Sequence, residues 1–440
     1  MKNILKSIAT FLIVFALCFS SSCNGGADKT DVFEIEFTSE ASVLVVGAEG
    51  FDKTAYSAKV LLNEAETDKT CEVTASNDCV KIENGNIVAT SAGEAVITAK
   101  YGEAEEQINI EVLEKKSLDA VTDESVINYF GRVKLENGCA SFHNTASGLE
   151  VNFIGSKLSA SIKSYGSKIG SFAVIANGKK EYRTIPVGSD KVTIFDGESG
   201  IHNVKFLKMC EQSVYRCDIL SLNSDGEFLS ANKKPELKFE FYGDSITCGY
   251  GNLLENSGYE NDQDGTETYA TMLADMFGAQ YSCISYSGIT GGIPLKGDTR
   301  TIYDFFDTYS ETDRTKYDFS KYQADLVVVN LGTNDTNAID YRGDDEMVNG
   351  YSKFITALRA KQPNAFILCC YGMMGVNERI DEDIRTAVEQ IIASGDRKIQ
   401  YFNVSANGYG TAGHPDIEGH KQAAESLAGI VERVVKLKRK

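Results

Sequence analysis

Residues 236–440 alternate short apolar runs with amphipathic helical patterns, and this rhythm restricts the possible fold more than any other feature of the chain. The apolar runs suited to buried strands are Leu237–Tyr242, Gln280–Ser285, Leu326–Asn330, Phe366–Tyr371 and Ile399–Asn403. Between them, apolar residues recur at helical spacing, as they do from Tyr269 to Phe277 and from Asp416 to Val435. Strands that alternate with amphipathic helices predict a parallel sheet covered on both faces, which is a three-layer α/β domain.

Two stretches before this domain predict β-sandwiches. Residues 32–114 contain several short strand-like runs separated by turns such as Glu83-Asn84-Gly85-Asn86. Residues 118–232 again contain alternating or continuous apolar runs, punctuated by glycines, and we expect a jelly roll there. The composition, 42% hydrophobic and 24% charged, is that of an ordinary globular protein. We therefore expect a multidomain chain with two N-terminal β-sandwiches followed by the α/β domain at 236–440.

The first 22 residues are typical of a secretory signal rather than of a folded domain. Two lysines precede the apolar run Ile8–Phe19, which is shorter than the ~20 residues needed to span a bilayer. The small residues after that run lead to Cys23, and this arrangement resembles a bacterial lipoprotein cleavage site. The resemblance implies an exported protein anchored to the outer membrane, at its periplasmic face or at the cell surface, by a lipid on Cys23. Secretion without an anchor is the alternative.

The charge of the chain excludes one class of partner. A formal net charge of −19 repels nucleic acid and anionic lipid headgroups, so we expect neither to bind. Contact with a membrane would then be through the lipid anchor alone. The one basic run, at residues 436–440, has the composition of a solvated helix end. The oligomeric state is not predicted by any of these features.

Eleven cysteines occur, none of them in the paired Cys-x-x-Cys spacing of a metal site, so we expect no metal and no other cofactor. The pairs Cys71/Cys79 and Cys210/Cys217 could be bridged across neighbouring strands in an oxidising compartment, or they could be free thiols. Cys369-Cys370 lies within an apolar strand, where both side chains belong to the core.

Short polar blocks come directly after three of the predicted strands and before the last helix. These blocks are Gly243-Asp244-Ser245, Ser285-Tyr286-Ser287-Gly288, Gly332-Thr333-Asn334-Asp335 and Gly413-His414-Pro415. Carboxyl ends of parallel strands meet at one edge of a sheet, so the blocks are expected to lie together. Ester cleavage needs an activated hydroxyl, a base of near-neutral pKa and donors for the developing oxyanion. Ser245 and His414 could supply the first two, whereas His420, inside the last helix, is assigned a structural role.

In this order the blocks resemble those of the Ser-Gly-Asn-His (SGNH, or GDSL-type) hydrolases. The resemblance implies that Ser245 is the nucleophile and that His414 is the general base. It implies an oxyanion hole formed by the backbone N–H groups of Ser245 and Gly288 and by the side chain of Asn334. Asp244 and Asp335 are then supporting residues that hold the loops, and the reaction needs no metal.

Longer segments resemble carbohydrate esterase family 2, whose hydrolase domain is preceded by a β-sandwich. They are "FYGDSITCGYGN", "SYSG" and "YDFSKYQADLVVVNLGTND", together with Tyr129-Phe130-Gly131-Arg132 at the start of the sandwich. This likeness implies removal of O-acetyl groups from polysaccharides of the xylan or mannan type. Farther upstream, "NGNIVATSAGEAVITAKYG" resembles bacterial immunoglobulin-like domains of group 2.

Two departures from the family concern the active site. The acid that stands two or three residues before the catalytic histidine is replaced by Ala412 and Thr411. A backbone carbonyl could orient His414, giving a dyad, or a distant carboxylate could do so; we favour the dyad. The chain also contains no tryptophan, so any sugar stacking would fall to tyrosine or phenylalanine. The aromatic-rich loop Thr301–Tyr322 could line an acceptor cleft, although core packing explains most of its rings.

Three functions remain open. The first is a polysaccharide O-acetyl esterase acting through an acyl-enzyme, with an acetylated polysaccharide or oligosaccharide as its partner. The second is a general acylhydrolase, lipase or thioesterase, because one scaffold serves many substrates. The third is a carbohydrate-binding surface lipoprotein whose esterase domain is vestigial. The intact set of Ser245, Gly288, Asn334 and His414 favours an active enzyme.

Overall fold

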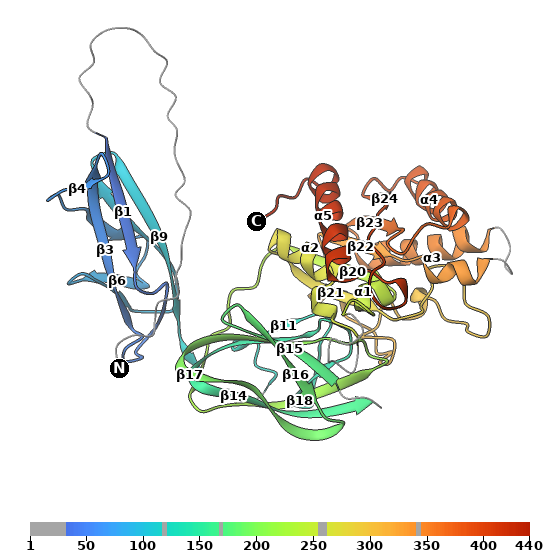
Figure 1. Ribbon diagram of the computed structural model, residues 1–440, viewed down its shortest axis with the longest axis horizontal. Helices are drawn as coiled ribbons and strands as arrows, with labels where there is room; N and C mark the ends of the chain where they lie inside the picture. Colours follow the sequence, from blue (N-terminus) through green and yellow to red (C-terminus); the bar gives the residue numbers. More distant parts are fainter. Residues whose placement is uncertain (1–31, 117–120, 167–169, 254–261, 340–344) are drawn as a thin grey trace, which may run out of the picture. The chain divides into compact units, whose positions relative to one another are not determined.

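The computed structural model describes residues 32–116, 121–166, 170–253, 262–339 and 345–440. The chain divides into two compact units, Met1–Lys116 and Ser117–Lys440. The predicted signal and Cys23 lie outside the described residues. A mostly-β N-terminal region precedes an α/β domain with a parallel sheet, as the sequence predicts (Figure 1).

The first unit consists of two sheets around one core. One sheet has the order β1-β3-β7-β6, with β4 beside β3, and the other has the order β2-β9-β8-β5. Buried side chains from both sheets meet between them, among them Leu44, Ile87 and Ile97. The predicted turn between β6 and β7 is present, and Asn84 and Gly85 both have positive φ. The strands are β1 Phe33–Ser39, β2 Val43–Val45, β3 Lys53–Leu62, β4 Ala65–Glu66, β5 Glu72–Ala75, β6 Val80–Glu83, β7 Asn86–Ala89, β8 Gly93–Tyr101, β9 Ala104–Leu113 and β10 Lys115–Lys116.

The second unit begins with an antiparallel β region in the order β12-β13-β18-β14-β17-β15-β16, with β11 and β19 beside β14. Its two longest strands, β14 and β17, pair along most of their length. Their register shifts between Gly155 and Ser159, which marks bulges where paired strands bend. The strands are β11 Ile127–Phe130, β12 Lys134–Glu136, β13 Cys139–Phe142, β14 Gly148–Gly166, β15 Gly170–Ala176, β16 Lys179–Ile185, β17 Gly188–Lys208, β18 Tyr215–Ser224 and β19 Glu227–Leu229.

The α/β part of this unit contains one parallel sheet in the order β21-β20-β22-β23-β24. Alternate residues of β22 pack on opposite faces. Val327 and Val329 share a core with α3 and α4, whereas Leu326 and Val328 share one with α2 and α5. The three layers are therefore those that the sequence predicts. The elements are β20 Lys238–Gly243, α1 Ser245–Cys248, α2 Tyr269–Phe277, β21 Gln280–Ser285, β22 Leu326–Asn330, α3 Glu346–Lys361, β23 Phe366–Tyr371, α4 Glu378–Ala393, β24 Ile399–Asn403 and α5 Ile417–Val434.

The structure decides between the alternatives left open for the cysteines. All nine cysteines in the described part of the chain are free thiols, including Cys71, Cys79, Cys210 and Cys217. Cys369 and Cys370 are both fully buried, so their assignment to the core is confirmed.

Most of the aromatic loop Thr301–Tyr322 packs as core. Phe305, Phe306 and Phe319 are buried, and Tyr303 and Tyr322 pack against the core beneath α3.

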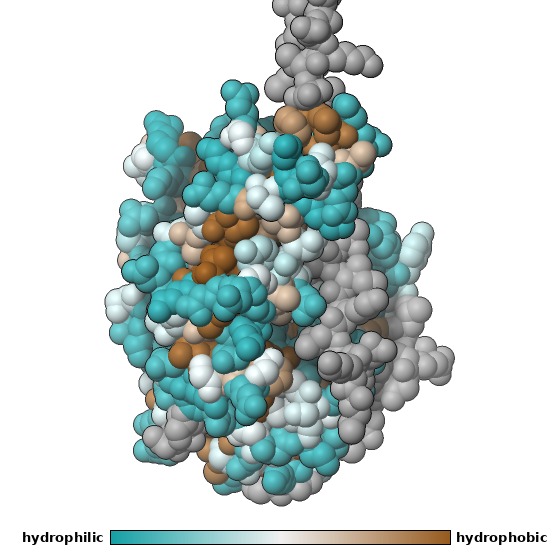
Figure 2. Space-filling model, turned by 90° about the vertical axis from the view of Figure 1, so that its left-hand side faces the viewer, coloured by the Kyte–Doolittle hydropathy of each residue, from teal (hydrophilic) through white to brown (hydrophobic). Residues whose placement is uncertain are grey.

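On the side drawn in Figure 2, the described residues form a surface that mixes hydrophobic and hydrophilic side chains. Brown hydrophobic groups there are small and are interrupted by teal hydrophilic residues. Among the helices of the described residues, none has the length and apolar character needed to cross a membrane.

Candidate active site

Ser245 lies directly beyond the carboxyl end of β20, which pairs with β21 on one side and β22 on the other. Asp244 caps the short helix α1, and its Oδ1 accepts a hydrogen bond from the backbone N–H of Ile246 at 3.0 Å. The strand must end in glycine, because a Cβ on Gly243 would lie 2.0 Å from Oγ1 of Thr247. This close turn places Ser245 at the sheet edge with 8% of its surface exposed, which is the position expected for a nucleophile.

His414, which precedes α5, meets Ser245 across 169 residues of sequence. Its Nε2 lies 2.9 Å from Oγ of Ser245, and its Nδ1 lies 3.1 Å from the backbone carbonyl oxygen of Thr411. A carbonyl can only accept, so Nδ1 carries the proton and Nε2 is free to accept the hydroxyl proton of Ser245. Ala412 and Gly413 both have positive φ, which turns the chain so that the Thr411 carbonyl reaches back to the ring.

The carboxylates that lie next to the site's blocks in the sequence have partners other than His414. Asp244 caps α1, Asp335 binds three backbone N–H groups, and Asp416 accepts from the N–H of Gly419 at 2.8 Å as the N-cap of α5. Within the described residues, the hydrogen-bond partner of Nδ1 of His414 is thus a carbonyl and not an acid.

Burial lowers the pKa of His414 below its ordinary value of 6.5, and the backbone carbonyls beside the ring oppose this shift. A pKa near the ordinary value was expected from the sequence, in which burial cannot be measured. The ring of Tyr250 packs against the imidazole at a centroid distance of 4.9 Å and contributes to that burial. His414 is therefore neutral, and competent as a base, at neutral pH.

The predicted oxyanion donors Gly288 and Asn334 lie in the turns that follow β21 and β22. Gly288 comes after β21 with φ of 83°, and its N–H has no hydrogen-bond acceptor among the described residues. Asn334 comes after β22; its Nδ2 donates to the carbonyl of Ile289 at 3.0 Å and lies 3.5 Å from Oδ2 of Asp244. Nδ2 donates in both contacts, which hold Asn334 beside the Gly288 turn and the Asp244 cap of α1.

Asp335 ties two of these loops together. Its carboxylate accepts from the backbone N–H groups of Gly291, Gly292 and Ile293 at 2.8, 2.9 and 3.0 Å. Burial raises the pKa of Asp335, while the three N–H groups favour its charged form. Burial, with a further contribution from Asp335, raises the pKa of Asp244 to about 7. Both carboxyl groups thus accept hydrogen bonds from backbone N–H groups of the site's loops.

Two neighbours of the site were not predicted. Oε2 of Glu211, from the segment between β17 and β18, accepts from the backbone N–H of Ser287 at 2.8 Å. No local pattern around Glu211 could have indicated this contact, since 76 residues separate the partners. Tyr250 lies in the conspicuous Gly249-Tyr250-Gly251 block, so its position near the nucleophile could have been inferred. No cluster of three or more His, Cys, Asp or Glu side chains suited to a metal occurs in the part of the chain that the structure describes.

Comparison with known proteins identifies this region. The GDSL-like Lipase/Acylhydrolase family matches residues 241–425. This part of the chain is a GDSL-like hydrolase domain. Its sequence relatives include the Cellulase/esterase CelE of Acetivibrio thermocellus, 30% identical over 305 residues, which are 66% of this chain. The chain spans only 37% of the length of that relative. An Acetylxylan esterase / glucomannan deacetylase of Cellvibrio japonicus is 23% identical over 326 residues, covering 70% of this chain and 89% of that protein.

Solved esterase structures match most of the chain. A family two carbohydrate esterase from Clostridium thermocellum, solved in complex with cellohexaose, superposes with a TM-score of 0.65 and 28% identity. The match covers 71% of this chain and 99% of that one. Proteins similar to this chain thus include family 2 carbohydrate esterases, the family that the sequence motifs resemble.

Proposed function

We propose that this protein is a serine esterase that removes O-acetyl groups from a polysaccharide of the xylan or mannan type. The observation that carries the proposal is the 2.9 Å contact between Oγ of Ser245 and Nε2 of His414, whose Nδ1 is bonded to a carbonyl. Hydroxyl and imidazole at this distance form the nucleophile–base pair needed for acyl transfer.

In the proposed reaction, Nε2 of His414 takes the hydroxyl proton while Oγ of Ser245 attacks the acetyl carbonyl. The developing oxyanion is stabilised by the backbone N–H groups of Ser245 and Gly288 and by Nδ2 of Asn334. The protonated imidazole then gives its proton to the departing sugar oxygen, which leaves an acetyl-enzyme. Water, deprotonated by the same nitrogen, attacks this ester and releases acetate and free Ser245.

The carbonyl of Thr411 takes the place of the third triad member in this mechanism. It fixes the tautomer and the orientation of the ring, as an acid would. It supplies a dipole rather than a full charge, so it stabilises the imidazolium less than a carboxylate does. A lowered pKa of His414 is consistent with such a dyad.

The substrate class is proposed from two further observations. The relatives are named as esterases of carbohydrates, and one of their structures contains cellohexaose. In this chain two exposed aromatic rings lie close to the histidine in sequence or in space. Tyr250 is 42% exposed and packs on His414, and Tyr409, which precedes the histidine in the same loop, is 78% exposed. Tyrosine rings of this kind can stack on sugars and so replace the missing tryptophan.

The test is a panel of acetylated xylan, glucomannan, pectin and peptidoglycan, with released acetate measured beside p-nitrophenyl esters of short and long acids. We expect acetate from xylan or glucomannan, and preference for the acetyl ester, with Ser245→Ala as the inactive control. A preference for long acyl chains would instead favour a general acylhydrolase. Binding of the polysaccharides without any ester hydrolysis would favour the vestigial-domain hypothesis and refute the esterase.

We also propose that the protein is exported and anchored by a lipid on Cys23, on the strength of the N-terminal sequence pattern. In cells that make the full chain, the protein should fractionate with the outer membrane and carry an acylated N-terminal cysteine by mass spectrometry. A soluble, unacylated Cys23→Ala variant is the expected control. Wild type found wholly in the culture fluid without lipid would contradict the anchor.

A further inference from the structure

One buried carboxylate from the β region of the second unit lies beside the turn that carries Gly288 in the candidate active site. Glu211 lies between β17 and β18 and is 2% exposed. Its Oε2 accepts from the backbone N–H of Ser287 at 2.8 Å and lies 3.7 Å from Sγ of Cys248, the last residue of α1. One carboxylate oxygen therefore contacts both the turn that carries Gly288 and the helix that begins with Ser245.

The turn at Gly288 depends on hydrogen bonds for its conformation. A Cβ on Gly288 would meet nothing within 4 Å, so side-chain packing does not confine this residue. The turn is held by Tyr286 N–H to the Gly243 carbonyl at 3.3 Å and by Ile289 N–H to the Tyr286 carbonyl at 3.1 Å. The bond from the Ser287 N–H to Glu211 is shorter than both. It is charge-assisted, and charge-assisted hydrogen bonds are roughly twice as strong as neutral ones.

A buried thiol lies beside the same contact. Sγ of Cys248 lies 3.2 Å from Oγ of Ser285 as well as near Glu211. Burial, and then the negative charge of Glu211, raise the pKa of Cys248 well above its ordinary value of 9.0. Cys248 therefore stays a neutral thiol and places no second negative charge beside the carboxylate.

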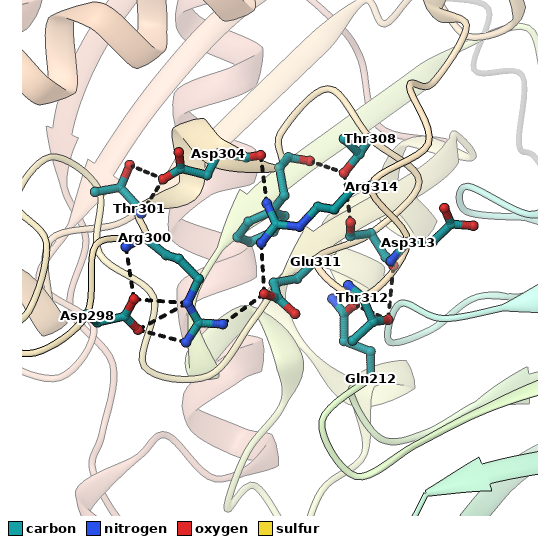
Figure 3. A network of polar contacts seen from close by, with 12 residues as sticks. Gln212, Asp298, Arg300, Thr301, Asp304, Thr308, Glu311, Thr312, Asp313 and Arg314 are labelled. Atoms are coloured by element: carbon teal, nitrogen blue, oxygen red, sulfur yellow. Dashed lines mark hydrogen bonds and ion pairs between the residues drawn. The ribbon is translucent and has the colours of Figure 1, made fainter.

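Glu211 is itself held on both sides. Its backbone N–H donates to Oε1 of Gln263 at 3.2 Å. The next residue, Gln212, accepts from the backbone N–H and the hydroxyl of Thr312 at 2.9 and 3.0 Å. Figure 3 shows this Gln212–Thr312 contact beside the ion-pair network of Asp298, Arg300, Glu311 and Arg314. The network fixes the loop that Gln212 contacts through Thr312. It therefore restrains the segment that carries the Glu211 carboxylate.

We propose that Glu211 is a positioning residue for the oxyanion hole. By accepting from Ser287, it fixes the peptide that precedes Gly288, so that the Gly288 N–H points at the position of the oxyanion before substrate arrives. Preorganised donors act mainly on charge that develops in the transition state, so the effect of Glu211 falls on kcat. This inference rests on the proposed esterase function. It implies that the β region contributes Glu211, a residue that orients a group of the active site.

The experiment compares three variants of the full chain. Glu211→Met removes the acceptor at similar volume, and Glu211→Gln keeps an acceptor oxygen. Tyr281→Phe is the matched control, since it removes one buried hydrogen bond between the same two regions, from Tyr281 Oη to the Ala146 carbonyl at 3.1 Å, away from the turn. With p-nitrophenyl acetate, Glu211→Met should lower kcat by about tenfold or more and change KM by less than about twofold, short of the ~10²–10³ loss of an entire donor. Glu211→Gln should retain kcat within about threefold, and Tyr281→Phe should match wild type.

Amide hydrogen exchange of the peptide around Ser287 gives a readout that does not depend on turnover. Exchange there should quicken in Glu211→Met and stay near wild type in the other two variants. Unchanged exchange, an unchanged kcat in Glu211→Met, or an equal loss of kcat in Tyr281→Phe would each overturn the proposal. A wild-type chain that hydrolyses no ester would instead refute the proposed function, and the exchange data would still decide whether Glu211 holds the turn.

Discussion

The most demanding prediction concerns Arg132, which joins the β region to the α/β region of the second unit. Its guanidinium is buried and donates to Oε1 of Glu240 at 2.9 Å and to the Tyr242 hydroxyl at 2.6 Å. It also donates to the backbone carbonyls of Phe306 and Thr308 at 2.7 and 2.6 Å. Glu240 is fully buried in β20, and the guanidinium of Arg132 forms an ion pair with it.

The cost of Arg132→Met arises from the groups that lose their partner. Removing one member of a buried ion pair costs about 3–5 kcal/mol, because the other charge stays buried and uncompensated. Each carbonyl left without a donor adds about 1–3 kcal/mol, less whatever relaxation or entering water recovers. We therefore expect the free energy of unfolding to fall by at least about 4 kcal/mol, which is roughly a thousandfold in the unfolding equilibrium. Typical stabilities are only about 5–15 kcal/mol, so the variant should be marginal.

Denaturant titration of the wild type and the variants, monitored by circular dichroism, measures this loss. Adding Glu240→Gln to Arg132→Met should restore part of it, because the buried charge is gone while Tyr242 and Gln362 keep a partner. The control is Lys134→Met, which breaks the partly exposed pair with Asp313 and should cost less than about 1 kcal/mol. A loss below about 1 kcal/mol in Arg132→Met, or a double variant weaker than the single one, would refute the reasoning.

Four further outcomes are expected. Ser245→Ala should lower turnover of p-nitrophenyl acetate by ~10⁴ or more with a melting temperature near that of wild type; activity within tenfold would contradict the nucleophile. Asn334→Ala should lower kcat by ~10²–10³ with KM nearly constant, whereas a rise in KM alone would make it a substrate-positioning residue. Because burial lowers the pKa of His414 and only neutral imidazole accepts the proton, kcat/KM should rise with pH through an apparent pKa below 6.5 and then stay level; an inflection above about 7 would contradict this. Asp244→Asn should reduce kcat by less than about 10²-fold in a folded variant, since a ~10⁴-fold loss would reveal a triad acid.

Most of the fold was predicted from local patterns of apolar and polar residues. The apolar runs at Gln280–Ser285, Leu326–Asn330, Phe366–Tyr371 and Ile399–Asn403 coincide with β21, β22, β23 and β24. Leu326–Asn330 and Phe366–Tyr371 were recognisable because strands buried on both faces read as apolar runs. The other two were recognisable because strands alternate with amphipathic helices in a parallel sheet. The same alternation places Ser245, Gly288 and Asn334 at one sheet edge, because each comes shortly after a parallel strand.

The group that orients His414 could not be predicted from local sequence patterns. From Thr411 and Ala412 the sequence indicated that a carboxylate was absent from its usual place, and it left a carbonyl and a distant acid as alternatives. The structure presents the Thr411 carbonyl to Nδ1 because Ala412 and Gly413 adopt positive φ, and burial sets the direction of the His414 pKa. Neither a backbone conformation of this kind at Ala412 nor the burial of a ring is encoded in a short motif.

The sequence by itself determined the class of fold, the strands and helices of the α/β domain and the residues at its sheet edge, since each depends on local periodicity and on the residues next to a strand's carboxyl end. Only the tertiary structure decided that the thiols are free, that Arg132 holds Glu240 and that Glu211 reaches Ser287. These contacts join residues 76 or 108 positions apart through buried charge. A buried charge needs a partner within hydrogen-bond distance, and which partner it has is decided by how the two regions pack, because sequence spacing does not record that distance.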